Sequence, residues 1–126
     1  MDGSDFKRVV YDVARQLGAR VVSIHEPNVT PNFVTAELAV GERHVYLLRS
    51  HAGDWALCSE VDFSGCRLLF DDNPSITDIL ESHHSIRVRS KADLLGPFVK
   101  HLGISDHDIR YWRPQTVGDA LFNWWD

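Results

Sequence analysis

The stretch that decides the fold runs from Asn32 to Phe70 and reads NFVTAELAV-GE-RHVYLLRS-HAGD-WALCSEV-DFSG-CRLLF. Four short segments rich in β-branched, aromatic and aliphatic residues are separated by groups of turn-forming residues. Segments of this length and spacing are typical of strands joined by hairpins. The stretch therefore predicts an antiparallel β-meander. With its flanking segments it predicts an α+β fold: an N-terminal helix, a meander of about four to six strands, and C-terminal helices packed on the sheet.

The first hairpin of the meander has a definite register. Gly41 and Glu42 form the two-residue loop that a tight hairpin needs, because Gly accepts a positive φ. Three cross-strand pairs follow: Val40 with Arg43, Leu38 with Val45, and Ala36 with Leu47. The side chains of these pairs share one sheet face, and Thr35, Glu37, Tyr46 and Leu48 lie on the other.

The length of the second turn, around Ala52 and Gly53, decides which face of the sheet the side chains of the next strand occupy, and the sequence leaves that length open. A loop with an even number of residues places Leu57 on the face of Leu48, whereas an odd number places it on the face of Leu47, since one residue of slip inverts a strand. In the first case Tyr46, Leu48 and Leu57 make the second face apolar, and that face is either covered by a helix or exposed as a binding surface. The plainer alternative is a sheet covered on one side only.

The flanking segments read mainly as helices. Apolar residues at helical spacing predict a helix over Phe6–Leu17, and Arg20–Ile24 reads as a short strand. After the meander, Pro74 opens a helix of about two turns, and Ile86–Val88 reads as a last short strand. Ser90 caps a helix with an apolar stripe from Leu94 to Leu102, and because Pro97 lies inside this pattern the helix either begins near Leu95 or kinks there. Thr116 and Asp119 cap a final helix, on which Leu121, Phe122 and Trp125 share a stripe.

Length and composition are those of one domain spanning residues 1–126, with 44% hydrophobic residues. No apolar run approaches the roughly 20 residues that a membrane-spanning helix needs. The N-terminus lacks the charged-then-apolar pattern of a signal peptide, so we expect a cytoplasmic protein and no membrane partner.

The net charge of −5 is concentrated in one segment. Between residues 54 and 81 a single base, Arg67, accompanies seven acids: Asp54, Glu60, Asp62, Asp71, Asp72, Asp78 and Glu81. This distribution disfavours nucleic acid as a partner, because binding to phosphates requires a basic surface. It suits a basic protein partner, or it is a solvated acidic edge that keeps the protein soluble.

Candidate chemical groups show no convergent spacing. His83 and His84 are adjacent, and Asp106-His107-Asp108 forms a second group, but neither pattern matches a metal-ligand motif. Glu60 and Asp62 share a strand face, as acid–base chemistry requires, without a nucleophile or phosphate loop nearby. Cys58 and Cys66 lie out of register for a disulfide. We therefore expect no catalytic residues, no metal and no cofactor.

The C-terminal tail is the most unusual part of the composition. Five aromatic residues fall within it: Tyr111, Trp112, Phe122, Trp124 and Trp125. Such residues dominate the binding energy of protein interfaces, but they also fill cores well. Both roles can coexist, with Trp125 facing inward and Trp124 facing outward.

A small, acidic, single-domain α+β chain with a meander and an aromatic end resembles the immunity proteins of bacterial toxin–immunity systems. A second resemblance, over Phe6–Val61 and closest in HVYLLRSHAGDWALCSEV, is to secretion-chaperone-like modules, although the C-terminal half departs from their pattern. The first resemblance implies a non-enzymatic protein that binds and neutralises one toxin domain. The second implies a module that holds a partner segment on an open sheet face.

The leading interpretation is thus an immunity-type inhibitor that occludes a basic toxin cleft. Four acids, Glu60, Asp62, Asp71 and Asp72, would steer the partner, and Trp112 or Trp124 would anchor it. A chaperone-like or scaffold module is the alternative, and a small enzyme comes third. The sequence leaves the oligomeric state and the identity of the protein partner open.

Overall fold

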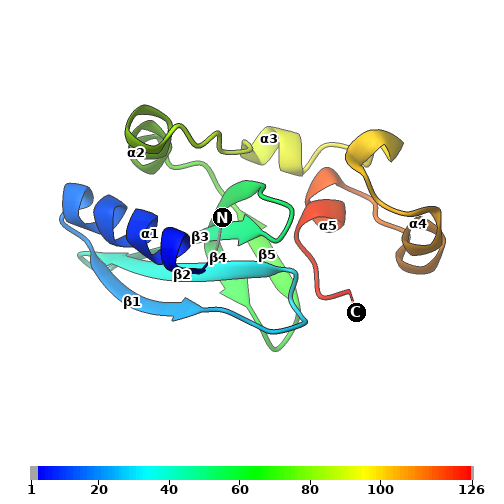
Figure 1. Ribbon diagram of the computed structural model, residues 1–126, viewed down its shortest axis with the longest axis horizontal. Helices are drawn as coiled ribbons and strands as arrows, with labels where there is room; N and C mark the ends of the chain where they lie inside the picture. Colours follow the sequence, from blue (N-terminus) through cyan, green and yellow to red (C-terminus); the bar gives the residue numbers. More distant parts are fainter. Residues whose placement is uncertain (1–2, 126) are drawn as a thin grey trace.

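The computed structural model describes residues 3–125 and shows an α+β fold in which a five-stranded antiparallel sheet is covered by helices (Figure 1). The meander and its flanking helices confirm the predicted fold class. The regular elements, in chain order, are α1 (Gly3–Leu17), β1 (Arg20–His25), β2 (Phe33–Val40), β3 (Arg43–Ser50), β4 (Trp55–Asp62), β5 (Arg67–Phe70), α2 (Pro74–His84), α3 (Lys91–Leu94), the 3-10 helix η1 (Lys100–Leu102), α4 (Asp106–Trp112) and α5 (Val117–Leu121). No helix within the described residues is long and apolar enough to cross a bilayer.

The strands lie in sequence order, β1-β2-β3-β4-β5, so every neighbour in the sheet is also a neighbour in the chain. The predicted register of β2 and β3 is confirmed, with Val40 opposite Arg43 and Leu38 opposite Val45. Gly41 takes a φ of 63° in the two-residue turn, a conformation that glycine adopts without strain. The meander therefore builds the whole sheet from local pairings.

Residues 51–54 separate β3 from β4, and Ser50 and Asp54 close a loop of three residues, 51–53. Ser50 N–H donates to the carbonyl of Asp54 over 2.8 Å, and Leu57 pairs with Leu47. Of the two loop lengths that the sequence left open, the odd one is observed, so the side chain of Leu57 lies on the same sheet face as that of Leu47. Gly53 closes the turn with a φ of 101°.

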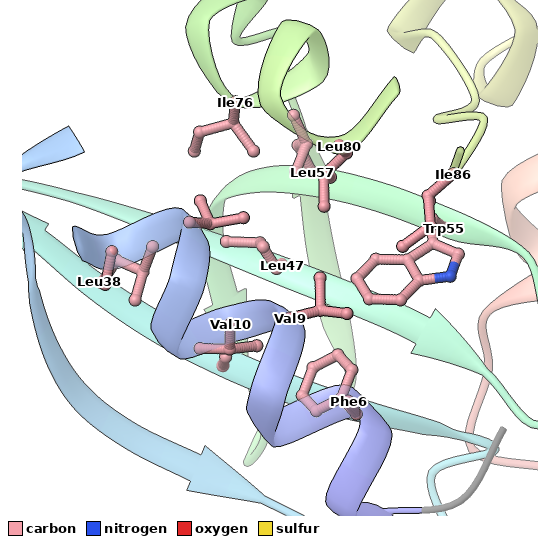
Figure 2. Close-up of a cluster of buried hydrophobic side chains, with 13 residues drawn as sticks. Phe6, Val9, Val10, Leu38, Leu47, Trp55, Leu57, Ile76, Leu80 and Ile86 are labelled. Atoms are coloured by element: carbon pink, nitrogen blue, oxygen red, sulfur yellow. The ribbon is translucent and has the colours of Figure 1, made fainter. Parts of the chain in front are cut away.

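The helix face of the sheet, defined by Ala36, Leu38, Leu47, Trp55 and Leu57, is covered by α1 and α2. Figure 2 shows Phe6, Val9 and Val10 of α1 pointing toward this face, with Ile76 and Leu80 of α2 beside them. The predicted α1 stripe is confirmed, because Phe6, Val9, Val10, Val13 and Ala14 are all buried. Each large apolar side chain buried here contributes roughly 2 kcal/mol.

The tail face, defined by Phe33, Leu48, Ala56, Cys58 and Phe70, is covered as well. Its cover is assembled from short pieces of the C-terminal half: Leu94 of α3, Val117 and Leu121 of α5, and Phe122. Packing here is close enough to require glycine at position 118, where an added Cβ would lie 2.6 Å from Cε2 of Phe70. The one-sided sheet is therefore excluded, and Leu48 is fully buried.

The C-terminal half departs from the predicted helices in three places. Helix α3 ends at Leu94, four residues after its Ser90 cap, because Pro97 disfavours helical backbone at Gly96. The predicted strand Ile86–Val88 is reduced to one parallel bridge between Val88 and Trp55. The capping box of Thr116 and Asp119 is present, but α5 ends at Leu121, so the predicted stripe through Phe122 and Trp125 is wrong.

Candidate partner-binding surface

The tip of the β4–β5 hairpin holds two of the predicted steering acids. Asp62 accepts hydrogen bonds from the backbone N–H of Gly65 at 2.9 Å and from the guanidinium of Arg67 at 3.2 Å. These bonds, the Gly65 one foremost, hold the pKa of Asp62 below its usual value. Glu60 lies opposite Leu69, beyond a bulge in β4, and is exposed. The hairpin therefore keeps the Asp62 carboxylate charged at neutral pH, and it uses Asp62 to shape its own turn.

Asp71 and Asp72 lie at the other end of β5. The Oδ1 atom of Asp72 accepts the backbone N–H of Lys91 at 2.9 Å, which fixes the start of α3. Asp71 accepts the N–H of Asp72 and is exposed. Asp71 follows Arg67 by four residues, so it lies roughly 13 Å along the strand from the Asp62 end. The four acids form a line along the β4–β5 edge rather than one cluster.

All the tail aromatics except Tyr111 line an aromatic groove with a volume of about 610 Å³ between β5 and the C-terminal segment. Trp112 stacks on Trp125 with ring centroids 5.7 Å apart, and Trp124 packs edge-on against Phe33 at 5.2 Å. The groove is lined by Cys66, Arg67, Leu68, Phe70, Trp112, Gly118, Asp119, Phe122, Asn123, Trp124 and Trp125. The structure thus brings Trp112 and Trp124, the two predicted anchors, to one site.

The two tryptophans differ in what they contact. Trp124 is half-buried on the tail face and also meets Phe63 of the hairpin tip at 6.3 Å. Trp125 is half-buried too, against Trp112, so the expected division into an inward Trp125 and an outward Trp124 does not hold. Tyr111, which precedes Trp112 on α4, is 69% exposed.

A polar latch that the sequence did not indicate holds the groove together. The side chain of Asn32 accepts the N–H of Asn123 at 2.8 Å and donates to the carbonyl of Leu121 at 3.1 Å. The backbone N–H of Asn32 donates to the carbonyl of Asn123 at 2.9 Å. An asparagine in a loop carries no local signal for a partner 91 residues away, so only the tertiary structure reveals this contact.

One member of the histidine pair considered as a metal site, His84, is engaged elsewhere. Nε2 of His84 lies 2.7 Å from Oδ2 of Asp12, which joins α2 to α1. Asp12 also accepts from Arg15 and Gln16, and its pKa is lowered, chiefly by the hydrogen bond with His84. Within the described part of the chain no three His, Cys, Asp or Glu side chains are arranged to hold a metal ion.

Both cysteines are free thiols. Burial on the tail face raises the pKa of Cys58 to about 12, so its thiol stays protonated and unreactive at neutral pH. Cys66 is exposed at the hairpin tip, with a φ of 54°. Within the described residues no side chain hydrogen-bonds to either thiol to activate it as a nucleophile; the Cys66 thiol donates to the carbonyl of Phe63 at 3.9 Å.

Comparisons with protein-family models, with curated proteins and with solved structures find no match for this chain.

Proposed function

We propose that this protein is a non-enzymatic, immunity-type inhibitor that binds a basic toxin domain and occludes its active-site cleft. The observation that carries the proposal is the aromatic groove, in which Trp112, Trp124 and Trp125 line one cavity beside the acidic β4–β5 edge. Buried aromatic anchors surrounded by charged side chains are the usual energetic centre of a protein interface.

The anchoring role suits Trp112 better than Trp124. Trp124 packs on Phe33 and Phe63, so it belongs to the cover of the tail face. Trp112 contacts Trp125 and its exposed neighbour Tyr111, on a short helix with no fully buried residue. A partner can therefore bury Trp112 and Tyr111 further without disturbing the core.

Electrostatic steering supports the same surface. Arg67 lines the groove and pairs with Asp62 at 3.2 Å, Glu60 lies two residues before Asp62 on β4, and Asp71 and Asp72 follow β5 directly and extend the negative charge. Exposed acids of this kind raise the association rate with a basic partner, and salt screens them over about 10 Å at 0.1 M.

The chaperone-like alternative depends on an open sheet face. Tyr46, on the tail face, is only half-buried, but Leu48 beside it is fully buried beneath the C-terminal segment. Burial raises the pKa of the Tyr46 phenol, with further contributions from Glu37 and Glu60. The described residues thus leave too little open sheet to favour this alternative over the groove.

The test is co-expression with a candidate toxin encoded beside this gene, scored by growth and by binding of the purified proteins. We expect the parent protein to restore growth, and Trp112→Ala to bind with a dissociation rate at least about tenfold faster, as for a central aromatic anchor. Glu60→Gln should slow association and weaken its salt dependence.

Two matched variants serve as controls. Tyr11→Ala removes an aromatic side chain that is 58% exposed on α1, and Glu42→Gln removes an exposed acid in the β2–β3 turn. Binding that responds to the control variants as strongly as to Trp112→Ala and Glu60→Gln would place the interface elsewhere. A toxin that remains active with the parent protein bound would contradict inhibition by occlusion.

A further inference from the structure

Strand β5 is an edge strand whose outer side has no neighbour among the described strands. The carbonyl of Leu69 accepts the hydroxyl of Ser59 in β4, and the N–H of Asp71 donates to the carbonyl of Leu57, so residues 69 and 71 direct their backbone groups toward β4. Backbone groups alternate in direction along a strand. Leu68 and Phe70 therefore present their N–H and C=O groups to the free side.

The other edge of the sheet is less suited to pairing. Strand β1 has a bulge between Val21 and Ser23, and bulges disrupt the regular row of groups that a new strand would need. The irregularity beside β5 lies in β4 instead, between Cys58 and Glu60. The regular free edge of this sheet is thus the edge of β5.

Arg67 and Leu69, on the helix face of β5, and Asp71, directly after the strand, form a self-complementary row. Arg67 is positive, Leu69 is apolar and 55% exposed, and Asp71 is negative and exposed. When this row is turned around and set antiparallel to itself with Leu69 at the centre, each arginine faces an aspartate and the two leucines meet.

We propose that β5 pairs with β5 of a second copy of this chain, antiparallel and centred on Leu69, to form a symmetric dimer with a continuous sheet. In this register Leu68 faces Phe70 of the second copy, and these are the residues whose backbone groups point outward, so each such pair exchanges both of its hydrogen bonds. Leu69 occupies the close, non-hydrogen-bonded pair, where cross-strand side chains make their best contact.

The charges complete the match. Arg67 lies beside Asp62 at 3.2 Å, with its side chain 81% exposed, and a guanidinium has donors to spare for Asp71 of the second copy. The dimer axis runs perpendicular to the sheet, so the contact is isologous and closes without further growth. Both aromatic grooves then open on the same side of the joined sheet.

Charge exchange tests this register directly. Sedimentation equilibrium at high micromolar concentration should give the dimer mass for the parent protein. Arg67→Asp and Asp71→Arg each place like charges opposite one another, so each should give the monomer mass. The double variant should recover the dimer, because the pairs are restored with the signs reversed. Both residues are exposed, and circular dichroism should show all variants folded.

Amide hydrogen exchange supplies a second readout. The amides of Leu68 and Phe70 should exchange slowly at high protein concentration and rapidly on dilution or in Asp71→Arg. Asp78→Arg, the same charge change at an exposed position of α2, is the control and should remain dimeric.

Three results would overturn the proposal. A parent protein that stays monomeric at every concentration would overturn it, even if the binding of a different protein slowed exchange of the β5 amides. A dimer that persists in both single variants would place the contact elsewhere, and a double variant that stays monomeric would exclude this register. These results report self-association only; toxin binding is measured separately with the parent protein, because Arg67 lines the groove and Asp71 belongs to the acidic edge.

Discussion

The two faces of one sheet are covered in different ways. The helix face lies under α1, a helix of fifteen residues, and under α2, and both carry apolar residues at helical spacing. The tail face lies under α3 and α5, of four and five residues, and under the extended segment that follows them. Such short helices have little stability of their own. The tail face therefore depends on tertiary contacts, and we expect it to open before the helix face does.

The largest expected effect compares adjacent residues on opposite faces. Leu47 and Leu48 are both fully buried, so truncating either to alanine should lower the free energy of unfolding by about 3 kcal/mol. In Leu47→Ala all elements should lose hydrogen-exchange protection together, whereas Leu48→Ala should release α5 first. Urea denaturation gives the total loss, and exchange gives its distribution. Equal loss of protection in α1 and α5 in both variants would mean that the two faces form one cooperative unit.

A smaller effect is expected from the latch. Asn32→Ala removes the acceptor for Asn123 and the donor to Leu121 in a part-buried site, which should cost about 1–3 kcal/mol. Limited proteolysis should then cut the chain after Leu121 while α1 stays intact. Asn73→Ala, which removes the cap that accepts the N–H of Ile76 in α2, is the matched change on the other face. It should cost about 1 kcal/mol, without new cleavage in the tail.

The smallest effect concerns the contact between α1 and α2. The folded-state pKa of Asp12 is below its ordinary value of 3.8, so its contribution to stability is complete above that value and disappears as the pH falls through the folded pKa. Asp12→Asn should therefore reduce stability at neutral pH and flatten the acid limb of the stability curve. Thermal unfolding between neutral and acid pH measures both effects, with Asp78→Asn as the control. An unchanged acid limb would show that the Asp12–His84 bond adds nothing to stability.

The predictability of each part follows the range of the interactions that form it. The α1 stripe, the Gly41 turn and the caps at Ser90 and Thr116 depend on residues close in sequence, and each was predicted. The sheet face on which the β4 side chains lie depends on whether Asp54 pairs with Ser50 or belongs to the loop. Composition does not decide between these two cases. The path of the C-terminal segment depends on hydrogen bonds with Asn32, which lies far away in the sequence. The sequence therefore could not show where α5 ends or which path the chain takes after it.

The residue types of the candidate surface were predictable from the sequence, but their arrangement in space was not. Residue type singled out the acids and Trp112 and Trp124, and both tryptophans line the groove. Their separate roles, with Trp124 on the tail face and Trp112 on the exposed helix α4, are fixed by Phe33 and Phe63, which lie elsewhere in the chain. Nothing in the local pattern at position 72 indicates that Asp72 fixes α3 through Lys91.

The distance in sequence between Asn32 and Asn123 bears on how the chain folds during its synthesis. The sheet, α1 and α2 are complete once α2 has left the ribosome, so the first two thirds of the chain can fold before the rest is made. The tail face stays bare until the segment after α5 has emerged, because residues 117–123 complete its cover. Through that interval Phe33 and Leu48 are open to water and to other nascent chains. Chaperone demand and aggregation during expression should therefore rise sharply in chains truncated before Val117.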